Sequence, residues 1–222
     1  MQWWGWVLLA AAAVLIYGMT FARWRFVVHH SEVHVLPKGA KPIRVLHISD
    51  VHMAPWQKRK QQFIKSLGSE APDLIINTGD NLGHQDVIHV TMNAYEAILK
   101  VPGVFVNGSN DYYAPRIKNP FSYLRAPSTP DNSRPLATSE LTNAFENHGW
   151  KNLNNRSAEI TINGTKIGFI GVDDPHDKLD DLSTLERLKN KVVIGVAHAP
   201  YRRVIEAFAE AGAAIMFAGH TH

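Results

Sequence analysis

The chain is organised around the stretch Ile43-Arg44-Val45-Leu46-His47-Ile48-Ser49-Asp50-Val51-His52. Its apolar run, from Val45 to Ile48, predicts a strand that is buried on both faces. The run ends in an acid and an imidazole two residues apart, and ligands of open α/β sheets bind just beyond the carboxyl ends of strands. Taken alone, Asp-x-His is weak evidence, because turn chemistry explains it equally well. His47 lies within the predicted strand, so we interpret it as structural.

Four further apolar runs end in the same way. They are Asp73–Thr78 before Gly79-Asp80-Asn81, Gly103–Asn107 before Gly108-Ser109-Asn110-Asp111, Lys191–Ala197 before His198, and Ala213–Ala218 before Gly219-His220-Thr221-His222. Coincidence is a poor explanation for five buried strands that each end in Asp, Asn or His. The strand ends supply enough oxygen and imidazole ligands for two divalent ions. The candidate metal ligands are Asp50, His52, Asp80, Asn110, His198, His220 and His222.

This ordered set resembles that of the calcineurin-like metallophosphoesterases, from about Ile43 to the last residue. The resemblance implies a four-layer α/β/β/α sandwich with mixed sheets, and attack of a metal-bound hydroxide on a phosphate mono- or diester. It also implies that one ion is held by Asp50, His52, Asp80 and His222, and that a second is held by Asp80, an amide, His198 and His220. Asp50 and His52 can share an ion only if the strand end is extended. Mixed imidazole and carboxylate ligation favours Mn, Fe or Zn.

The third motif departs from the family pattern, which usually reads Gly-Asn-His-Asp or Gly-Asn-His-Glu. An ungapped match places Ser109 at the Asn position and Asn110 at the His position. Either Ser109 is a weak ligand or the carbonyl oxygen of Asn110 reaches the ion, and we favour Asn110. An Asn cannot donate a proton as an acid, so weak protonation of the leaving group is expected unless His84, His176 or a metal-bound water substitutes. His84 is the better placed in the sequence, although a surface histidine remains its more ordinary interpretation.

The N-terminal segment Trp3–Phe21 has no charged residue and is long enough to approach the ~30 Å core of a bilayer. It predicts a retained transmembrane helix, with a cleaved signal peptide and a buried core helix as alternatives. Arg23 and Arg25 follow the span, which favours a single-pass membrane protein with its catalytic domain on the cytoplasmic side. A substrate at the membrane surface would suit such an anchor.

Apolar periodicity places the remaining elements. Asn163-Gly164 between two apolar runs predicts a β-hairpin within Ser157–Val172. Asp173–Asp177 either lines the pocket with its carboxylates or forms a proline turn, and we favour the turn. The irregular stretch Tyr112–Thr138 is either a wall of the substrate pocket or a solvated loop. Helices are predicted at Gln57–Ser69, Val87–Lys100, Ser139–Asn147 with Ser139 as its cap, Leu179–Lys189 and Tyr201–Ala211, and a short strand at Glu32–Leu36.

Composition narrows the function classes. The 222 residues carry a net charge of only +3 and no long basic run, so no nucleic-acid partner is expected, and no protein partner is predicted. The absence of Cys leaves only N and O ligands for a metal. The expected organisation is a membrane anchor over residues 1–25, a linker with a short strand over 26–42, and a phosphoesterase domain over 43–222 that looks incomplete at its C-terminus. The alternative to a hydrolase is a metal-binding protein that has the same ligands but little or no activity.

Overall fold

The apolar run around Leu46 forms the first strand of a parallel sheet. The structure is a computed structural model that describes residues 3–20, 24–115 and 133–221. Within these residues the first sheet has four strands in chain order, each parallel to its neighbour. They are β1 (Val45–Ile48), β2 (Leu74–Asn77), β3 (Gly103–Phe105) and β4 (Lys151–Asn152). Their carboxyl ends therefore meet at one edge of the sheet.

The second sheet begins with the predicted hairpin. Asn163 and Gly164 have positive φ angles of 49° and 82°, as a type I′ turn requires, and they join two antiparallel strands. The next two strands are parallel to the second strand of the hairpin, so this sheet is mixed. Its strands in order are β5 (Arg156–Ile162), β6 (Thr165–Gly171), β7 (Val192–Ala197) and β8 (Ile215–Ala218).

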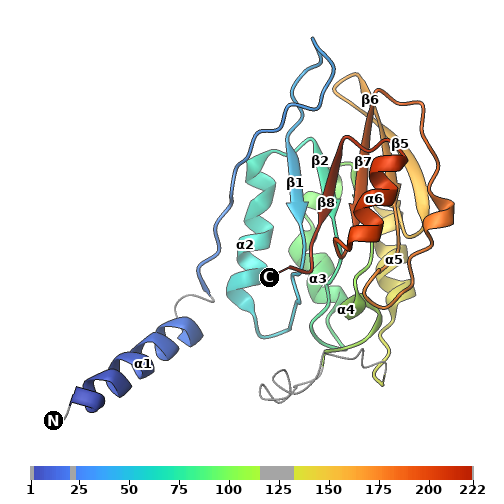
Figure 1. The fold of residues 1–222 in the computed structure, drawn as a ribbon. Coiled ribbons are helices and arrows are strands. Elements are labelled where there is room, and N and C mark those ends of the chain that lie inside the picture. The colour runs from blue at the N-terminus through green and yellow to red at the C-terminus, as the bar shows by residue number, and fades with distance from the viewer. Residues whose placement is uncertain (1–2, 21–23, 116–132, 222) are drawn as a thin grey trace.

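The two sheets face each other and are covered by helices on their outer sides (Figure 1). Leu74, Ile76 and Val104 of the first sheet pack against Phe169 and Ile194 of the second, which forms the inner core. The helices pack on the outer faces because their apolar stripes match the opposite side chains of the same strands. The expected α/β/β/α layering is thus observed.

The outer helices confirm most of the predicted elements. On the first sheet lie α2 (Lys58–Ser66) with η2 (Leu67–Glu70), α3 (Ile88–Tyr95) with η3 (Ile98–Lys100), and α5 (Thr138–Asn147); on the second lies α6 (Arg202–Glu210). Four details were predicted wrongly. Strands β1 and β8 are only partly buried, not buried on both faces, and His47 of β1 is exposed. Ala137, not Ser139, is the N-cap of α5. Residues 32–36 form no strand. The predicted helix at Leu179–Lys189 is only the short η5 (Leu182–Thr184), since Leu182, Leu185 and Leu188 pack on the second sheet from an otherwise irregular chain.

The N-terminal segment forms α1 (Trp3–Thr20), which projects away from the sheets (Figure 1). In the described part of the chain, no helix combines the length and the apolar character that crossing a membrane requires. The predicted transmembrane helix is therefore not supported. Arg23, on which the predicted orientation partly rested, lies outside the described residues, as does the stretch 116–132 of the proposed pocket wall. The location of the domain stays a prediction.

Candidate metal centre

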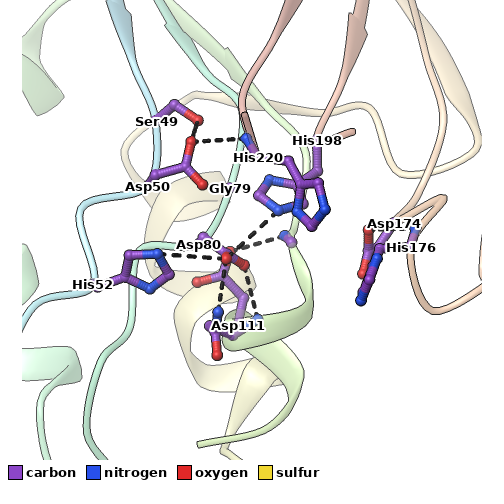
Figure 2. A network of polar contacts seen from close by, with 12 residues as sticks. Ser49, Asp50, His52, Gly79, Asp80, Asp111, Asp174, His176, His198 and His220 are labelled. Carbon is purple, nitrogen blue, oxygen red and sulfur yellow. Dashed lines mark hydrogen bonds and ion pairs between the residues drawn. The ribbon is translucent and has the colours of Figure 1, made fainter. Parts of the chain in front are cut away.

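The predicted ligands gather where the two sheets present the carboxyl ends of their strands (Figure 2). Asp50 and His52 follow β1, Asp80 follows β2, and Asn110 lies in the short helix α4 (Ser109–Tyr112) that follows β3. From the second sheet, His198 follows β7 and His220 follows β8. His222, the seventh candidate, lies outside the described residues.

The Asp80 carboxylate is the centre of this cluster and is only 2% exposed. Its Oδ2 atom lies 3.7 Å from His52 Nε2 and 3.5 Å from His198 Nε2. Asn110 donates to the same carboxylate twice, from its backbone N to Oδ1 at 2.8 Å and from Nδ2 to Oδ2 at 2.7 Å. One carboxylate is thus approached by side chains that follow β1, β3 and β7.

The backbone at four of the predicted ligands is left-handed. The φ angles are 53° at Asp50, 42° at His52, 55° at Asp80 and 68° at His220. Such angles are uncommon outside glycine and are typically found at functional sites that the surrounding structure holds in place. They also correct the expectation of an extended strand end at Asp50 and His52. The turn still brings these two residues together with Asp80, because ligand atoms of all three lie within 4.8 Å of one another.

Backbone hydrogen bonds hold the loops after β1 and β2 against each other. Asp50 N donates to Gly79 O at 3.0 Å, and His52 N donates to Asp80 O at 2.9 Å. The sheet ladder therefore continues past the last strand residues and sets the positions of Asp50 and His52 relative to Asp80.

Gly108, the glycine of the third motif, lies so close to the side chains of Asp80 and His198 that no side chain fits there. A Cβ atom on Gly108 would lie 2.7 Å from His198 Nδ1 and closer still to Asp80 Oδ1. Any larger residue would push apart two of the predicted ligands. The same holds for Gly219, where a Cβ would collide with Ser49 Oγ and Asp50 Oδ2. These close approaches explain why the segments that carry Asn110 and His220 begin with glycine.

The third motif places Asn110, not Ser109, against the Asp80 carboxylate. Asp111, the last residue of the motif, is fully buried and accepts hydrogen bonds from Gly108 N, Asn81 N and Asn81 Nδ2. Burial, and then the charge of Asp80, raise the pKa of Asp111 to about 7. Asp111 thus braces the loop that carries Asn110, and its carboxylate is engaged by Gly108 and Asn81.

His198 links the two sheets and presents one nitrogen to the centre. Its Nδ1 lies 2.7 Å from Thr78 O, which fixes the ring, while the buried Nε2 has no hydrogen-bond partner among the described residues. Burial lowers the pKa of His198, but the charges of Asp80 and Asp174 outweigh it, so the pKa lies above its ordinary value. For His220, burial and the neighbouring His198 and His176 lower the pKa.

Sequence reasoning named His176 as a possible acid but favoured a simple turn for Asp173–Asp177, whereas the structure places Asp174 and His176 at this edge of the molecule. Because β6 runs parallel to β7, the segment after β6 reaches the same edge as His198 and does more than turn the chain. The His176 ring lies 4.7 Å from the His220 ring, and Asp174 is fully buried (Figure 2). The run Asp-Asp-Pro-His-Asp after a buried strand was the available signal, but only the strand pairing shows where that run lies.

His84 was the better placed substitute acid in the sequence, but its ring packs against the exposed Trp56, at a centroid distance of 5.4 Å. His176 is the histidine that contacts a predicted ligand. His47 contacts both sheets, with Nε2 2.9 Å from Thr78 Oγ1 and its ring edge-on to Phe217 of the second sheet, and its structural role stays a prediction.

The donors present fit divalent ions of the Mn, Fe or Zn kind. The cluster offers carboxylate oxygens and imidazole nitrogens, which these ions accept together, and the amide of Asn110 can present its oxygen after a half-turn. The Nε2 of His198, which faces Asp80 Oδ2 without a hydrogen bond, is aimed as a ligand would be, since its other ring nitrogen contacts a backbone carbonyl.

Comparisons with known proteins agree with this geometry. The family model described as Calcineurin-like phosphoesterase matches residues 43–222. A search of curated proteins found no match. Among solved structures, TT1561 of Thermus thermophilus is 16% identical over 80% of this chain and 81% of its own, with a TM-score of 0.49. The purple acid phosphatase PPD1 from yellow lupin (Lupinus luteus) seeds is 14% identical over 84% of this chain and 39% of its own, with a TM-score of 0.51. At this identity the lupin enzyme supports the fold alone.

Proposed function

The chain belongs to the calcineurin-like phosphoesterase family, and from that premise we propose that it hydrolyses a phosphate monoester or diester at a pair of divalent ions. The observation that carries the proposal is the convergence on the Asp80 carboxylate of His52, His198 and Asn110, each from a different strand end. A structural role for a buried carboxylate would not need two imidazoles that face it from beyond hydrogen-bonding distance.

The described residues divide into two proposed sets of ligands. Asp50, His52 and Asp80 form the compact group whose ligand atoms lie within 4.8 Å of one another. His198 and His220 lie on the side of Asp80 away from His52 (Figure 2), with ring centroids 5.2 Å apart, and Asn110 donates to the Asp80 carboxylate. Asp80 belongs to both sets. His222 would join the first set, as the family pattern implies.

Bound divalent ions would supply a nucleophile at neutral pH and offset charge on the phosphoryl oxygens. The protein's own contribution is to hold its ligands in place before the substrate arrives. The hydrogen bond from His220 N to Asp50 Oδ2, 3.0 Å long, fixes one carboxylate, and the contact of His198 Nδ1 with Thr78 O fixes one imidazole. Asn110 occupies the place of the usual family histidine and has no proton to give as an acid. His176, beside His220, is the imidazole best placed to stand in for it.

The test is hydrolysis of p-nitrophenyl phosphate and bis(p-nitrophenyl) phosphate by purified protein loaded with Mn²⁺. Asp80→Ala should lower kcat/KM by at least about 100-fold, because it removes the ligand shared by both ions. Asp86→Ala, which changes an exposed carboxylate in the same loop region, is the matched control and should keep wild-type activity. Mn²⁺ uptake measured by calorimetry, without turnover of either ester, would instead identify a metal-binding protein that lacks hydrolase activity.

A further inference from the structure

A cavity of about 490 Å³ opens between the end of α1 and the start of α2. Its lining combines two indole rings, two cationic side chains and one hydroxyl, from Thr20, Trp24, Trp56, Lys58 and Arg59. The end of α1 and the start of α2 lie side by side there (Figure 1). The cavity is thus built from segments that the metal centre does not use.

Trp56, which forms one wall of the cavity, lies in the same loop as the predicted ligand His52. Trp56 lies four residues after His52, in the loop that joins β1 to α2. Within this loop Ala54 N donates to Gln57 Oε1 at 2.9 Å, and Lys60 Nζ donates to Val51 O at 2.6 Å. These bonds cross-link the loop at both ends, so the position of Trp56 relative to His52 is set by the fold.

A second loop supports the same wall. Met53 pairs with Leu82 in an isolated parallel bridge, and Gly83 N donates to Met53 O at 2.8 Å. His84, at the end of that loop, contacts the Trp56 ring edge-on. The loop that follows Asp80 therefore also supports the Trp56 wall of the cavity.

The charges in the cavity favour an anion. Lys58 and Arg59 are both exposed, and neither forms an ion pair with another described residue. They occupy the first turn of α2, where no acidic residue is present. Cations are ordinarily disfavoured at this end of a helix, because the unpaired N–H groups already carry partial positive charge. The positive potentials of Lys58, Arg59 and the N-terminus of α2 thus add at one wall of the cavity, where they attract an anion.

The indoles favour a body attached to that anion. Trp56 is 64% exposed, an unusual fraction for a large apolar side chain held in a well-braced loop. An indole face can stack on a planar ring or pack against an alkyl chain. At an exposed site it binds a cation only weakly, because water competes for the cation. Apolar surface beside unpaired cations matches a ligand that is anionic at one end and apolar at the other.

We propose that this cavity is a second subsite of the phosphoesterase, which binds an anionic group and the ring or alkyl body joined to it on the substrate. This assignment rests on the proposed function, because it gives the part of the substrate beyond the reacting phosphate a place on the protein. It defines the substrate class as an ester that carries a further negative charge and an apolar body.

The test measures binding in the absence of metal, so that it does not depend on hydrolysis. Calorimetry of the full chain in EDTA compares ADP, which has a planar ring, with dihexanoyl phosphatidic acid, which has alkyl chains, and with inorganic phosphate, which has neither. We expect ADP or dihexanoyl phosphatidic acid to bind at least about tenfold more tightly than phosphate. The tighter of the two identifies the body that the indoles accept.

Variants then assign the binding to the cavity. The double substitution Lys58→Gln and Arg59→Gln should weaken binding of the preferred probe by about tenfold or more, since it removes both charge-assisted contacts. Trp56→Ala should weaken the same probe but leave phosphate binding unchanged. Lys65→Gln, an exposed cation at the other end of α2, is the matched control and should bind as the wild type does.

Two results would overturn the proposal: binding of both probes no tighter than phosphate, or wild-type affinity in the Lys58/Arg59 and Trp56 variants. Turnover of p-nitrophenyl phosphate by the Mn²⁺-loaded protein is measured in parallel. If the protein binds the probe but does not turn over the ester, the proposed hydrolase function is contradicted. If it turns over the ester but does not bind the probe, only the proposed subsite is contradicted.

Discussion

At the scale of single residues, buried acidic side chains that are not proposed ligands also lie at the edge where the strands of both sheets end. Asp174 is fully buried and accepts a hydrogen bond from His176 N at 2.9 Å. Burial raises the pKa of Asp174 to about 6, although the hydrogen bond from His176 and the charge of His198 oppose the shift. In the metal-free protein this carboxyl group therefore holds its proton more tightly in the folded state than in the unfolded state, where the pKa is about 4.

Asp174→Asn should flatten the dependence of stability on pH in EDTA. Since the folded pKa is raised, the contribution of Asp174 is present below about pH 4 and is lost as the pH rises through about 6. We expect the unfolding free energy of the wild type to fall by on the order of 2–3 kcal/mol more than that of Asp174→Asn between pH 4 and 7. Urea unfolding at a series of pH values measures the difference. Parallel curves for the two proteins would contradict the assignment, and Asp86→Asn, at an exposed site, serves as the control.

At the scale of elements, α6 fixes the segment that carries Asp174 and His176. Arg203 of α6 donates from Nη1 and Nη2 to the Asp180 carboxylate and from Nη2 to Pro175 O at 3.2 Å. The Asp180 side chain is only 2% exposed, whereas Arg203 is 46% exposed. Through these contacts of Arg203, α6 holds the segment after β6 in place.

Arg203→Gln should lower the unfolding free energy by about 1–3 kcal/mol, because it leaves the buried Asp180 carboxylate without its charged partner. The neighbouring Arg202 offers a matched control. It pairs with Glu206 one turn along α6, but its side chain is 91% exposed, so Arg202→Gln should change stability by less than about 0.5 kcal/mol. Chemical unfolding of both variants at pH 7 makes the comparison. Equal effects of the two substitutions would show that the contact of Arg203 with Asp180 does not stabilise the fold.

At the scale of the whole molecule, the candidate metal centre joins the two sheets. His198 of the second sheet contacts Thr78 O of the first, and His220 N of the second donates to Asp50 Oδ2 of the first. The centre therefore lies between two halves that unfolding would separate. An ion bound there stabilises only the folded chain, since the unfolded chain has no assembled ligand set.

Mn²⁺ at about 100 times its Kd should raise the unfolding free energy by about 2.7 kcal/mol, which for a domain of this size raises Tm by roughly 5–10 °C. Asp80→Ala should abolish the increase, because it removes the shared carboxylate. Differential scanning calorimetry with and without Mn²⁺ measures both. An equal rise in Tm for wild type and Asp80→Ala would place the ion elsewhere on the protein.

Local pattern was enough to predict the elements that depend on neighbouring residues. Five apolar runs became strands, of which β2, β3 and β7 are buried and β1 and β8 are only partly buried. Asn163-Gly164 became the hairpin turn, because turn geometry acts over a few residues. The chemical types at the strand ends also showed which residues to expect at the metal centre. The pattern was misleading at Leu182, Leu185 and Leu188, since a spacing of three serves an irregular chain packed on a sheet as well as it serves a helix.

By itself, the sequence determined the strands, the order of their polar ends and the donor types available to an ion. Only the tertiary structure decided that Asp50 and His52 turn in the left-handed region, that Asn110 contacts Asp80, and that His176 lies against His220. The physical reason is that these contacts join residues that are far apart in the chain. They depend on the register and direction of paired strands and on the packing of one sheet against the other, which no local pattern of side chains encodes.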